Sequence, residues 1–468
     1  MPPSLALFLW FILTVALLSW DPAKQSTTSP ALWVPVIWMF ILGSRLPSQW
    51  LGGPIGQAVQ ALEEGNPLNR TVSSALLLLA FGILMSRSFK WGNFLARNLV
   101  LTAFLSFALV SVLWSDFPFV ALKRWIRDLG NYLVILVALS DRRPLEAIRT
   151  VLRRVSYLLV PLSILLIKYY PQIGKQYQFW TGADMYVGAT TSKNMLGVAC
   201  LISGLFFFWD TVTRWPERKR RRTKRILLVN VAFIAMTFWL LNLSSSATST
   251  VCLVIGCLVI AAVHTKSLKR RPALLKVMIP TCFCLYLVLA FVFNMNGELA
   301  GAVGRDPTLT DRTKIWEVLL SMHTNPLVGT GYESFWLGPR LEFFQQKSGL
   351  GFLNEAHNGY LELYLNLGLI GLFILIGFLV ASYLTICRRL SSSSSLVSLQ
   401  LALWTLLLLY NCTEAAFKGQ LMWVVFLLAV LVVPERVANR VRSVSAVGKA
   451  DAAQQVPICF LETTGQRR

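Results

Sequence analysis

Long apolar stretches recur along the whole chain, and they constrain its fold more than any other feature. A helix needs about 20 apolar residues to cross a bilayer core, and shorter runs suffice where flanking side chains reach the interface. Because lipid offers the backbone no hydrogen-bond partners, such segments must be helical. The sequence therefore predicts an all-α polytopic membrane protein with about 12–13 transmembrane helices. The predicted spans lie at 4–20, 31–43, 71–86, 98–114, 128–140, 156–169, 195–211, 226–242, 249–264, 277–293, 363–386, 398–411 and 421–433.

The composition of the 468-residue chain argues against a soluble enzyme. Hydrophobic residues make up 55% and charged residues 14% of the chain, and the mean hydropathy is +0.59, whereas about a quarter of a soluble protein is charged. So much apolar surface needs lipid as its solvent. The cysteines lie mostly inside apolar runs and show no paired spacing beside histidines, so we expect neither a disulfide framework nor a metal site.

Membrane topology explains the net charge of +22. Basic residues gather on alternate loops, and the positive-inside rule makes these loops cytoplasmic, so we expect no nucleic-acid partner. The first apolar run has no basic residue before it and no cleavage pattern before Asp21, and is interpreted as a retained span. The N-terminus is outside if every run is a span, and inside if one of the first two is not. The basic segments are Arg87–Arg97, Asp141–Arg154, Arg214–Arg225, Lys266–Lys276, Arg388–Arg389 and the tail after Pro434.

The segment between Asn294 and Leu361 is then the longest non-cytoplasmic loop, and its charges are mixed in sign. Within it, DRTKIWEVLLSM at 311–322 has the apolar spacing of a short amphipathic helix, and NPLVGTGYESFW follows as a glycine-containing turn. From His357 the chain passes into an apolar run without a break. We therefore expect His357 at the boundary between water and lipid, where a side chain can act on the headgroup of a membrane-held substrate.

Basic residues near other outer ends are candidates for binding an anion. Arg124 and Arg127 stand in a loop that the topology places outside, where positive charge is unusual. They either form ion pairs with Asp116 or Asp128, or they bind an anion. Lys193 stands at the outer start of a span, where a helix N-terminus supplies further donors.

The chain contains no Walker loop, no glycine-rich dinucleotide turn and no Asp-x-Asp pair. A transfer reaction would therefore take its energy from an activated substrate. A lipid-linked pyrophosphate fits this need, because its leaving group is an anion and its tail stays in the membrane. Arginine suits such a group, since its guanidinium binds phosphate oxygens bidentately.

The motif HNGYLELYLNLGLIG begins at His357 and contains Gly368 and Gly371. It resembles the signature of the O-antigen ligase and Wzy-type polymerase superfamily of bacterial envelope glycosyltransferases. Upstream, GRDPTLTDRTKIWEVLLSMHTNPLVGTGYESFW resembles the segment of that family in which an arginine, here Arg312, precedes a tryptophan-bearing surface helix. WSDFP at 114–118 and the Lys-Asn pair at 193–194 are most similar to exopolysaccharide polymerisation proteins of the exopolysaccharide Q kind.

The resemblance implies a GT-C-type, metal-independent glycosyltransferase without a cofactor, in the bacterial inner membrane. Such an enzyme joins undecaprenyl-pyrophosphate-linked oligosaccharide units into exopolysaccharide or O-antigen polymer at the periplasmic face. The implied partners are the lipid-linked glycan, the bilayer and a chain-length-regulating or export protein. Ala247 stands about where ligases of the family carry a further arginine, which favours a polymerase.

The implied organisation has five parts. They are N-terminal spans at 1–94, a central membrane bundle at 95–293, a periplasmic catalytic loop at 294–362 that carries short helices, C-terminal spans at 363–434, and a basic cytoplasmic tail at 435–468 that we expect to be disordered.

The resemblance makes His357 the essential histidine and Arg312 an arginine that binds the donor pyrophosphate. In the expected reaction an acceptor hydroxyl attacks the anomeric carbon of the donor with inversion. His357 would orient that hydroxyl or take its proton, because the unperturbed pKa of histidine is near ~6.5. The residues expected to stabilise the leaving pyrophosphate are Arg312, helped by some of Arg305, Lys193, Arg124 and Arg127.

Further loop residues have supporting roles or only structural ones. Glu355 is either a second base or an exposed glutamate. Trp316 and Tyr332 either stack on sugar faces or belong to the aromatic belt at the interface. Asn358 is expected to fix His357 by a hydrogen bond.

Three rival functions stay open. A ligase of the same family would transfer finished polymer to a lipid A core. A transporter of lipid-linked sugars would bury paired ionisable residues at mid-membrane, whereas this chain gathers polar residues in one outer loop. A non-catalytic assembly partner would have no use for His357 and Arg312.

Overall fold

The computed structural model describes residues 1–21, 28–53, 65–177, 182–266, 268, 271–289, 312–349, 353–390 and 395–433. Within these residues the chain is helical apart from one antiparallel hairpin, β1 (Lys175–Tyr177) with β2 (Asp184–Tyr186). Six described helices are long and apolar enough to cross a membrane, or seven if one bent pair is a single span, and five shorter apolar helices accompany them. The all-α polytopic fold is confirmed, while the exact number of crossings stays a prediction. Arg305 and the tail from 435 lie outside the described residues.

Each predicted span overlaps a helix. Proline occupies the first turn of many of them, because the first helical position needs no backbone N–H. The helices are α1 (Pro3–Ser19), η2 (Pro30–Leu32), α2 (Trp33–Leu42), α3 (Pro47–Trp50), α5 (Pro67–Ser86), α6 (Trp91–Arg97), α7 (Leu99–Val110), η3 (Ser111–Trp114), α8 (Pro118–Leu139), α9 (Pro144–Tyr169), α10 (Pro171–Gly174), α11 (Lys193–Arg214), η4 (Trp215–Glu217), α12 (Arg221–Ser244), α13 (Ala247–His264), α15 (Pro272–Leu287), α17 (Arg312–Ser321), α18 (Gly338–Ser348), α19 (Gly359–Arg389), α20 (Leu396–Tyr410) and α21 (Leu421–Val430).

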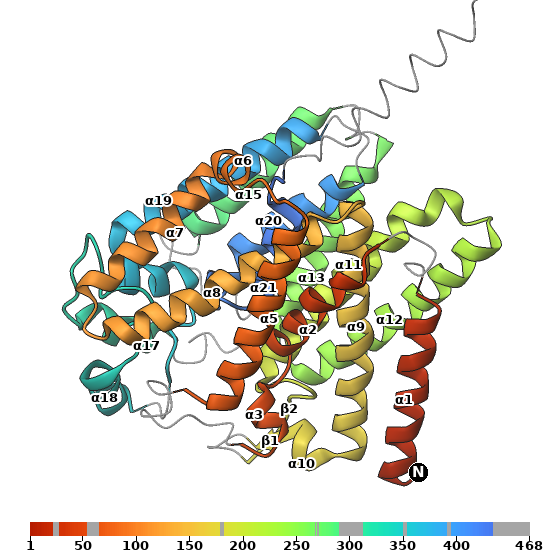
Figure 1. Cartoon of the computed structure of the whole chain (residues 1–468), viewed down its shortest axis with the longest axis horizontal. Coiled ribbons are helices and arrows are strands. Elements are labelled where there is room, and N and C mark those ends of the chain that lie inside the picture. Colours follow the sequence, from red (N-terminus) through yellow and green to blue (C-terminus); the bar gives the residue numbers. More distant parts are fainter. Residues whose placement is uncertain are drawn as a thin grey trace, which may run out of the picture.

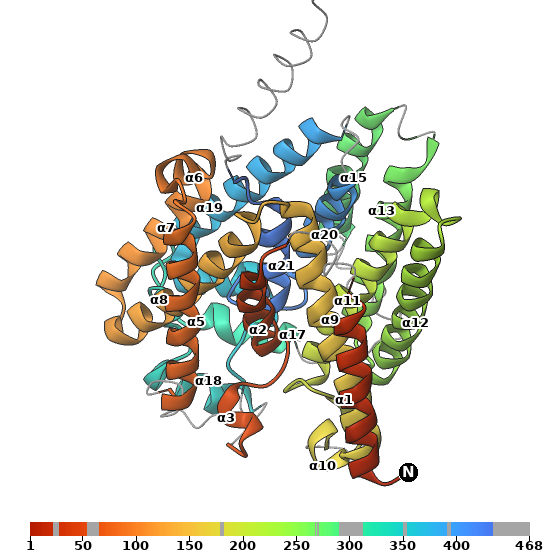
Figure 2. The ribbon, with the colours of Figure 1, turned by 45° about the vertical axis from the view of Figure 1, so that its right-hand side comes forward.

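The helices pack into one bundle. In Figure 1, α9, α11 and α12 lie next to one another and α1 runs along the edge of this group, which agrees with the packing of α11 on α12 and of α1 on α9. On the other side of the bundle α19 runs along α7, as Figure 2 also shows. A continuous buried core reaches from Leu32 to Leu431, so early and late spans share the same interior.

The basic segment at 141–154 is mostly helix, which corrects its prediction as a loop. α9 begins at Pro144, and its guanidinium groups are paired rather than solvated. Arg153 lies 3.4 Å from both Asp21 and Asp210, and all three residues are buried. Because the ion pairs satisfy these charges, the helix can extend through the basic segment.

α19 is broken at Gly368, where the sequence predicts an unbroken span. Gly368 has φ 63° and ψ −167°, and a side chain there would come within 2.3 Å of the backbone of Leu327. The amide of Leu369 donates to the carbonyl of Pro326 at 2.9 Å, and that of Ile370 to Leu327 at 3.1 Å. Carbonyl groups of the turn NPLVGTG therefore accept the hydrogen bonds that carbonyls of α19 would accept in an unbroken helix.

The start of α1 lies at the same end of the bundle as the start of α11. The hydroxyl of Tyr170, just after α9, donates to the carbonyl of Pro3 at 3.0 Å. The chain then passes through α10 and the hairpin before α11 begins at Lys193, and both figures show the N-terminus beside α10. The ion pairs of Asp21 and Asp210 lie at the opposite end of these helices.

Candidate active site

Residues from three distant elements meet at one carboxylate, Glu414, in the loop between α20 and α21. Nη2 of Arg312 donates to its Oε1 at 2.7 Å, and Nδ2 of Asn194 donates to the same oxygen at 3.1 Å. Nδ1 of His357 lies 3.4 Å from the other oxygen, Oε2. Glu414 is only 6% exposed. The structure thus joins the predicted His357 and Arg312 through a residue that the sequence did not single out.

Close backbone packing puts Glu414 in this place. The amide of Gly359, at the start of α19, donates to the carbonyl of Asn411 at 2.9 Å. A side chain at 359 would come within 1.9 Å of Oδ1 of Asn411, which accepts from the amide of Ala416 at 2.8 Å. Glycine in the motif H-N-G is therefore needed for a close approach. An acidic residue in the short gap between two apolar spans is the sequence signal that could have identified Glu414.

Arg312 is the first residue of α17 and is 4% exposed. Its Nη2 pairs with Glu414, but its Nη1 is buried and has no hydrogen-bond partner among the described residues. A buried donor left without a partner costs about 1–3 kcal/mol. A guanidinium held on one side and unpartnered on the other is suited to an anionic ligand.

The backbone around His357 is held in an uncommon conformation. His357 has φ 47°, in the left-handed region that non-glycine residues rarely adopt. On one side, the amide of Ala356 donates to Oε2 of Glu362 at 2.9 Å, and Nε1 of Trp316 donates to the carbonyl of Ala356 at 2.9 Å. On the other side, Oδ1 of Asn358 accepts from two amides of the first turn of α19. The side chain of Asn358 therefore caps α19, instead of bonding to the imidazole as the sequence predicts, and Trp316 bonds to the residue before His357.

Two carboxylates face the imidazole of His357. Oε1 of Glu355 lies 3.1 Å from Nδ1, and Oε2 of Glu414 also faces this atom. Burial lowers the pKa of His357, but the hydrogen bond to Glu414 and the charges of Glu355 and Glu414 outweigh burial and Arg312, so the pKa is raised above its ordinary value. With Nδ1–H turned to a carboxylate, Nε2 is the atom that can accept a proton.

The same three residues have the geometry of a possible metal site. One ligand atom from each of Glu355, His357 and Glu414 lies within 4.8 Å of the others. However, Arg312 already pairs with Glu414 at 2.7 Å, and a cation would be repelled by this guanidinium. The donor set therefore fits proton transfer better than a resident metal ion.

Three of the other predicted residues lie around a neighbouring turn: Arg124, Arg127 and Tyr332. Arg127 pairs with Asp128 at 3.4 Å, as the ion-pair alternative predicts, and Arg124 donates to the carbonyl of Glu333. The hydroxyl of Tyr332 donates to Asp128 at 2.9 Å, so it already has a hydrogen-bond partner within the protein. A role of Arg124 or Arg127 in binding pyrophosphate stays a prediction.

Lys193 is nearer to the carboxylate centre. It begins α11, where Ser192 caps the helix, and its neighbour Asn194 reaches Glu414. Within the described part of the chain, Lys193 forms no ion pair. Its charge stands at the N-terminus of α11, next to the residue that bonds to Glu414.

Two comparisons with known proteins show what the chain is similar to. Residues 231–376 match a family model described as O-antigen ligase. The chain is also 31% identical over 319 residues to the exopolysaccharide production protein ExoQ of Rhizobium meliloti (strain 1021), which covers 64% of this chain and 68% of that protein. Arg312 and His357 lie inside the range of the family model, whereas Glu414 lies beyond it.

Proposed function

Because this chain belongs to the family of O-antigen ligases and exopolysaccharide production proteins, we propose that it joins lipid-linked oligosaccharide units into a polysaccharide. The donor is an undecaprenyl-pyrophosphate-linked glycan, and the site faces the periplasm from the bacterial inner membrane. The observation that carries the proposal is the centre at Glu414, which holds Arg312 and His357 together.

Arg312 supplies the anion-binding part of the centre. Its unpartnered Nη1 donates to an oxygen of the pyrophosphate, while Glu414 holds the guanidinium in place. As the bond between the anomeric carbon and the phosphate oxygen breaks, negative charge grows on the leaving group. A donor already placed in a buried site stabilises this charge without reorganisation.

His357 supplies the base. The hydroxyl of the acceptor sugar attacks the anomeric carbon with inversion, the new glycosidic bond forms, and the lipid pyrophosphate leaves. The hydroxyl proton passes to Nε2 of His357, and the carboxylates of Glu355 and Glu414 at 3.1 and 3.4 Å from Nδ1 stabilise the imidazolium. The reaction balances without a nucleotide, a redox cofactor or a metal ion.

Polymerisation is favoured over transfer to a lipid A core. Ala247 begins α13, and the hydroxyl of the next residue, Thr248, lies 3.0 Å from that of Thr413, beside Glu414. The position about where related ligases carry a further arginine is therefore close to the centre and uncharged here. Ligation is the second candidate function.

The test uses purified protein in lipid with a synthetic undecaprenyl-pyrophosphate repeat unit, EDTA and no nucleotide. Wild type is expected to produce a ladder of polymer, and His357→Ala to produce none. Glu342→Gln, on the exposed face of α18, is the control and should retain the ladder. A single product that forms only with added lipid A core would identify a ligase. Loss of the ladder with EDTA, restored by a divalent cation, would show that the reaction needs metal.

A further inference from the structure

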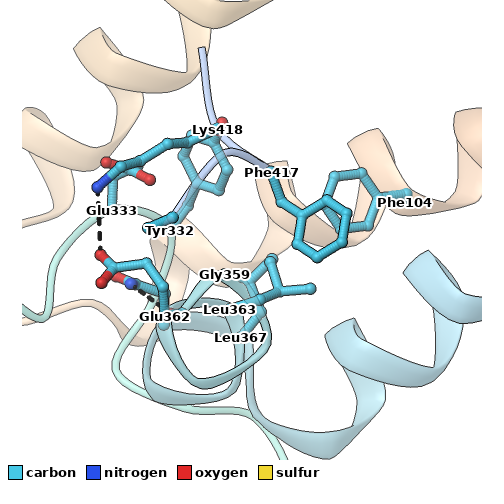
Figure 3. A pocket seen from close by; sticks show the side chains of 11 residues that line it. Phe104, Tyr332, Glu333, Gly359, Glu362, Leu363, Leu367, Phe417 and Lys418 are labelled. Carbon is cyan, nitrogen blue, oxygen red and sulfur yellow. Dashed lines mark hydrogen bonds and ion pairs between the residues drawn. The ribbon is translucent and has the colours of Figure 1, made fainter. Parts of the chain in front are cut away.

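A small cleft lies beside the carboxylate centre. It is formed by the start of α19, the turn at 332–333, the loop at 415–418 and one residue of α7 (Figure 3). Gly359 and Ala415 line it; Gly359 is two residues after His357, and Ala415 directly follows Glu414. Arg312 pairs with Glu414 and is not among the residues that line the cleft.

The cleft has a polar wall and an apolar wall. Figure 3 shows Glu333, Glu362 and Lys418 together on one side, and Phe104 and Phe417 on the other. Its enclosed space is about 20 Å³, which is the size of a single water molecule or hydroxyl group. A ligand larger than water would therefore keep its body in the open mouth and insert one small polar group.

Of the three charged side chains in the polar wall, Glu333 has the fewest hydrogen-bond partners among the described residues. Its backbone has φ 51°, so it shares with His357 a conformation that is uncommon for a residue with a side chain. The donation from Arg124 to its carbonyl holds that backbone. Among the described residues nothing donates to its carboxylate, which lines the cleft half-buried.

Lys418 is also able to bind a further group. Its Nζ lies 3.5 Å from Oε1 of Glu362, longer than the ~2.7–2.9 Å of a strong charge-assisted hydrogen bond. Oε1 already accepts from Nε1 of Trp336 at 2.7 Å. Burial lowers the pKa of Lys418, but the charges of Glu362, Glu333 and Glu355 outweigh it, so the ammonium stays protonated and can donate.

The charge of the cleft selects against phosphate. Two carboxylates, Glu333 and Glu362, face one ammonium, so the wall carries net negative charge and repels an anion. Hydroxyl groups of a sugar can instead donate to Glu333 and accept from Lys418, and the C–H face of a sugar ring can lie on Phe417.

We infer that this cleft binds the acceptor glycan through an uncharged sugar residue, with Glu333 and Lys418 as the groups that recognise its hydroxyls. The inference rests on the proposed function, since it gives the acceptor a binding site next to His357 and distinct from the proposed pyrophosphate group at Arg312. Glu333 then determines which acceptor is used, and it takes no part in the proton transfer.

The test measures binding of lipid-free oligosaccharides, released by partial hydrolysis of the polysaccharide of the host cell, to the full-length protein in lipid nanodiscs. Calorimetry gives the dissociation constant for wild type, Glu333→Gln, His357→Ala and the surface control Glu342→Gln. We expect Glu333→Gln to weaken binding by about tenfold, as expected for a lost hydrogen bond to a charged group. Binding by Glu342→Gln should match wild type, and His357→Ala should retain binding, weakened by less than in Glu333→Gln.

The outcomes separate this inference from the proposed function. If wild type forms polymer but binds no oligosaccharide, or if Glu333→Gln binds as tightly as Glu342→Gln, the cleft is not the acceptor site. If the protein forms no polymer but binds oligosaccharide in a way that depends on Glu333, the cleft is a glycan-binding site and the proposed polymerase function is wrong. Loss of binding in His357→Ala would show that the glycan binds at the carboxylate centre instead of in the cleft, and the inference would be wrong.

Discussion

At the scale of single residues, the two oxygens of Glu414 have different partners. Oε1 accepts from Arg312 and Asn194, whereas Oε2 faces His357. One buried carboxylate thereby sets the distance between the proposed anion-binding group and the proposed base. Any substitution at Glu414 is expected to disturb both groups at once.

Arg312 should not be replaceable by lysine. A guanidinium can pair with Glu414 through Nη2 and still present Nη1 to the substrate, whereas an ammonium offers a single nitrogen. Both Arg312→Ala and Arg312→Lys are expected to slow polymer formation on the order of 100-fold, equivalent to about 3 kcal/mol. Initial rates with the lipid-linked repeat unit measure the effect. Full activity of Arg312→Lys would show that the residue acts only as a point charge.

The pH dependence of the reaction should report the environment of His357. Because its pKa is raised and the base must be neutral, activity should increase with pH through a midpoint above ~6.5. Glu355→Gln removes a charge that raises this pKa, so the midpoint should move to lower pH. The pH profile of initial rates for both proteins is the measurement. An unchanged midpoint in Glu355→Gln would exclude His357 as the titrating group.

At the scale of elements, the break in α19 and the turn NPLVGTG form one unit. The amide of Thr330 donates to the carbonyl of Leu365 at 3.1 Å, and that of Gly331 to Asn366 at 2.9 Å. Oδ1 of Asn366 accepts from the amide of Phe335 at 3.1 Å. The first turns of α19, which follow His357, are therefore positioned by the preceding loop as well as by the membrane bundle.

Gly368→Ala should disrupt the packing of the turn NPLVGTG against the break in α19. Alanine would need a positive φ and would meet the backbone of Leu327 at 2.3 Å, so we expect a loss of at least about 2 kcal/mol in unfolding free energy. Gly82→Ala, in α5 with nothing within 4 Å of an added Cβ, is the matched control and should be neutral or slightly stabilising. Thermal unfolding in detergent compares the two variants. Equal melting temperatures would mean that α19 can close the break.

At the scale of the whole molecule, α1 begins at the end of the bundle that carries the candidate site. The contact between Tyr170 and Pro3 supports this arrangement, and Figure 1 shows α18 and the N-terminus toward the same end. The sequence left the side of the N-terminus open. In the structure α1 (Pro3–Ser19) is one of the shorter apolar helices, so the side of the N-terminus stays a prediction.

Cysteine labelling of intact cells can check this arrangement. Three single cysteines are introduced at exposed positions of a variant without native cysteines: Ser4→Cys, Glu342→Cys and Lys219→Cys. We expect a membrane-impermeant thiol reagent to label the first two and to leave the third unlabelled until the cells are opened. Labelling of position 342 without position 4 would place the N-terminus on the other side. Labelling of 219 in intact cells would invert the whole topology.

Much of the molecule could be predicted from local patterns. Each apolar run overlaps a helix, and the short helix expected at 311–322 is α17 (Arg312–Ser321). His357 and Arg312 carried recognisable motifs. The prediction of a loop at 141–154 was wrong. The arginines of α9 pair with Asp21 and Asp210, which are far away in sequence, so a local pattern could not show that this segment is helical.

Hydropathy, charge and motif spacing belong to neighbouring residues, so the sequence by itself determined the helices, the membrane class and the two motif residues. The tertiary structure alone decided that Glu414 links His357 to Arg312, that α19 breaks at Gly368, and that Asn358 caps a helix instead of holding the imidazole. The reason is physical: each of these features is a contact between backbone or side-chain atoms from separate elements. Only the packing of the whole bundle brings those atoms within hydrogen-bond distance.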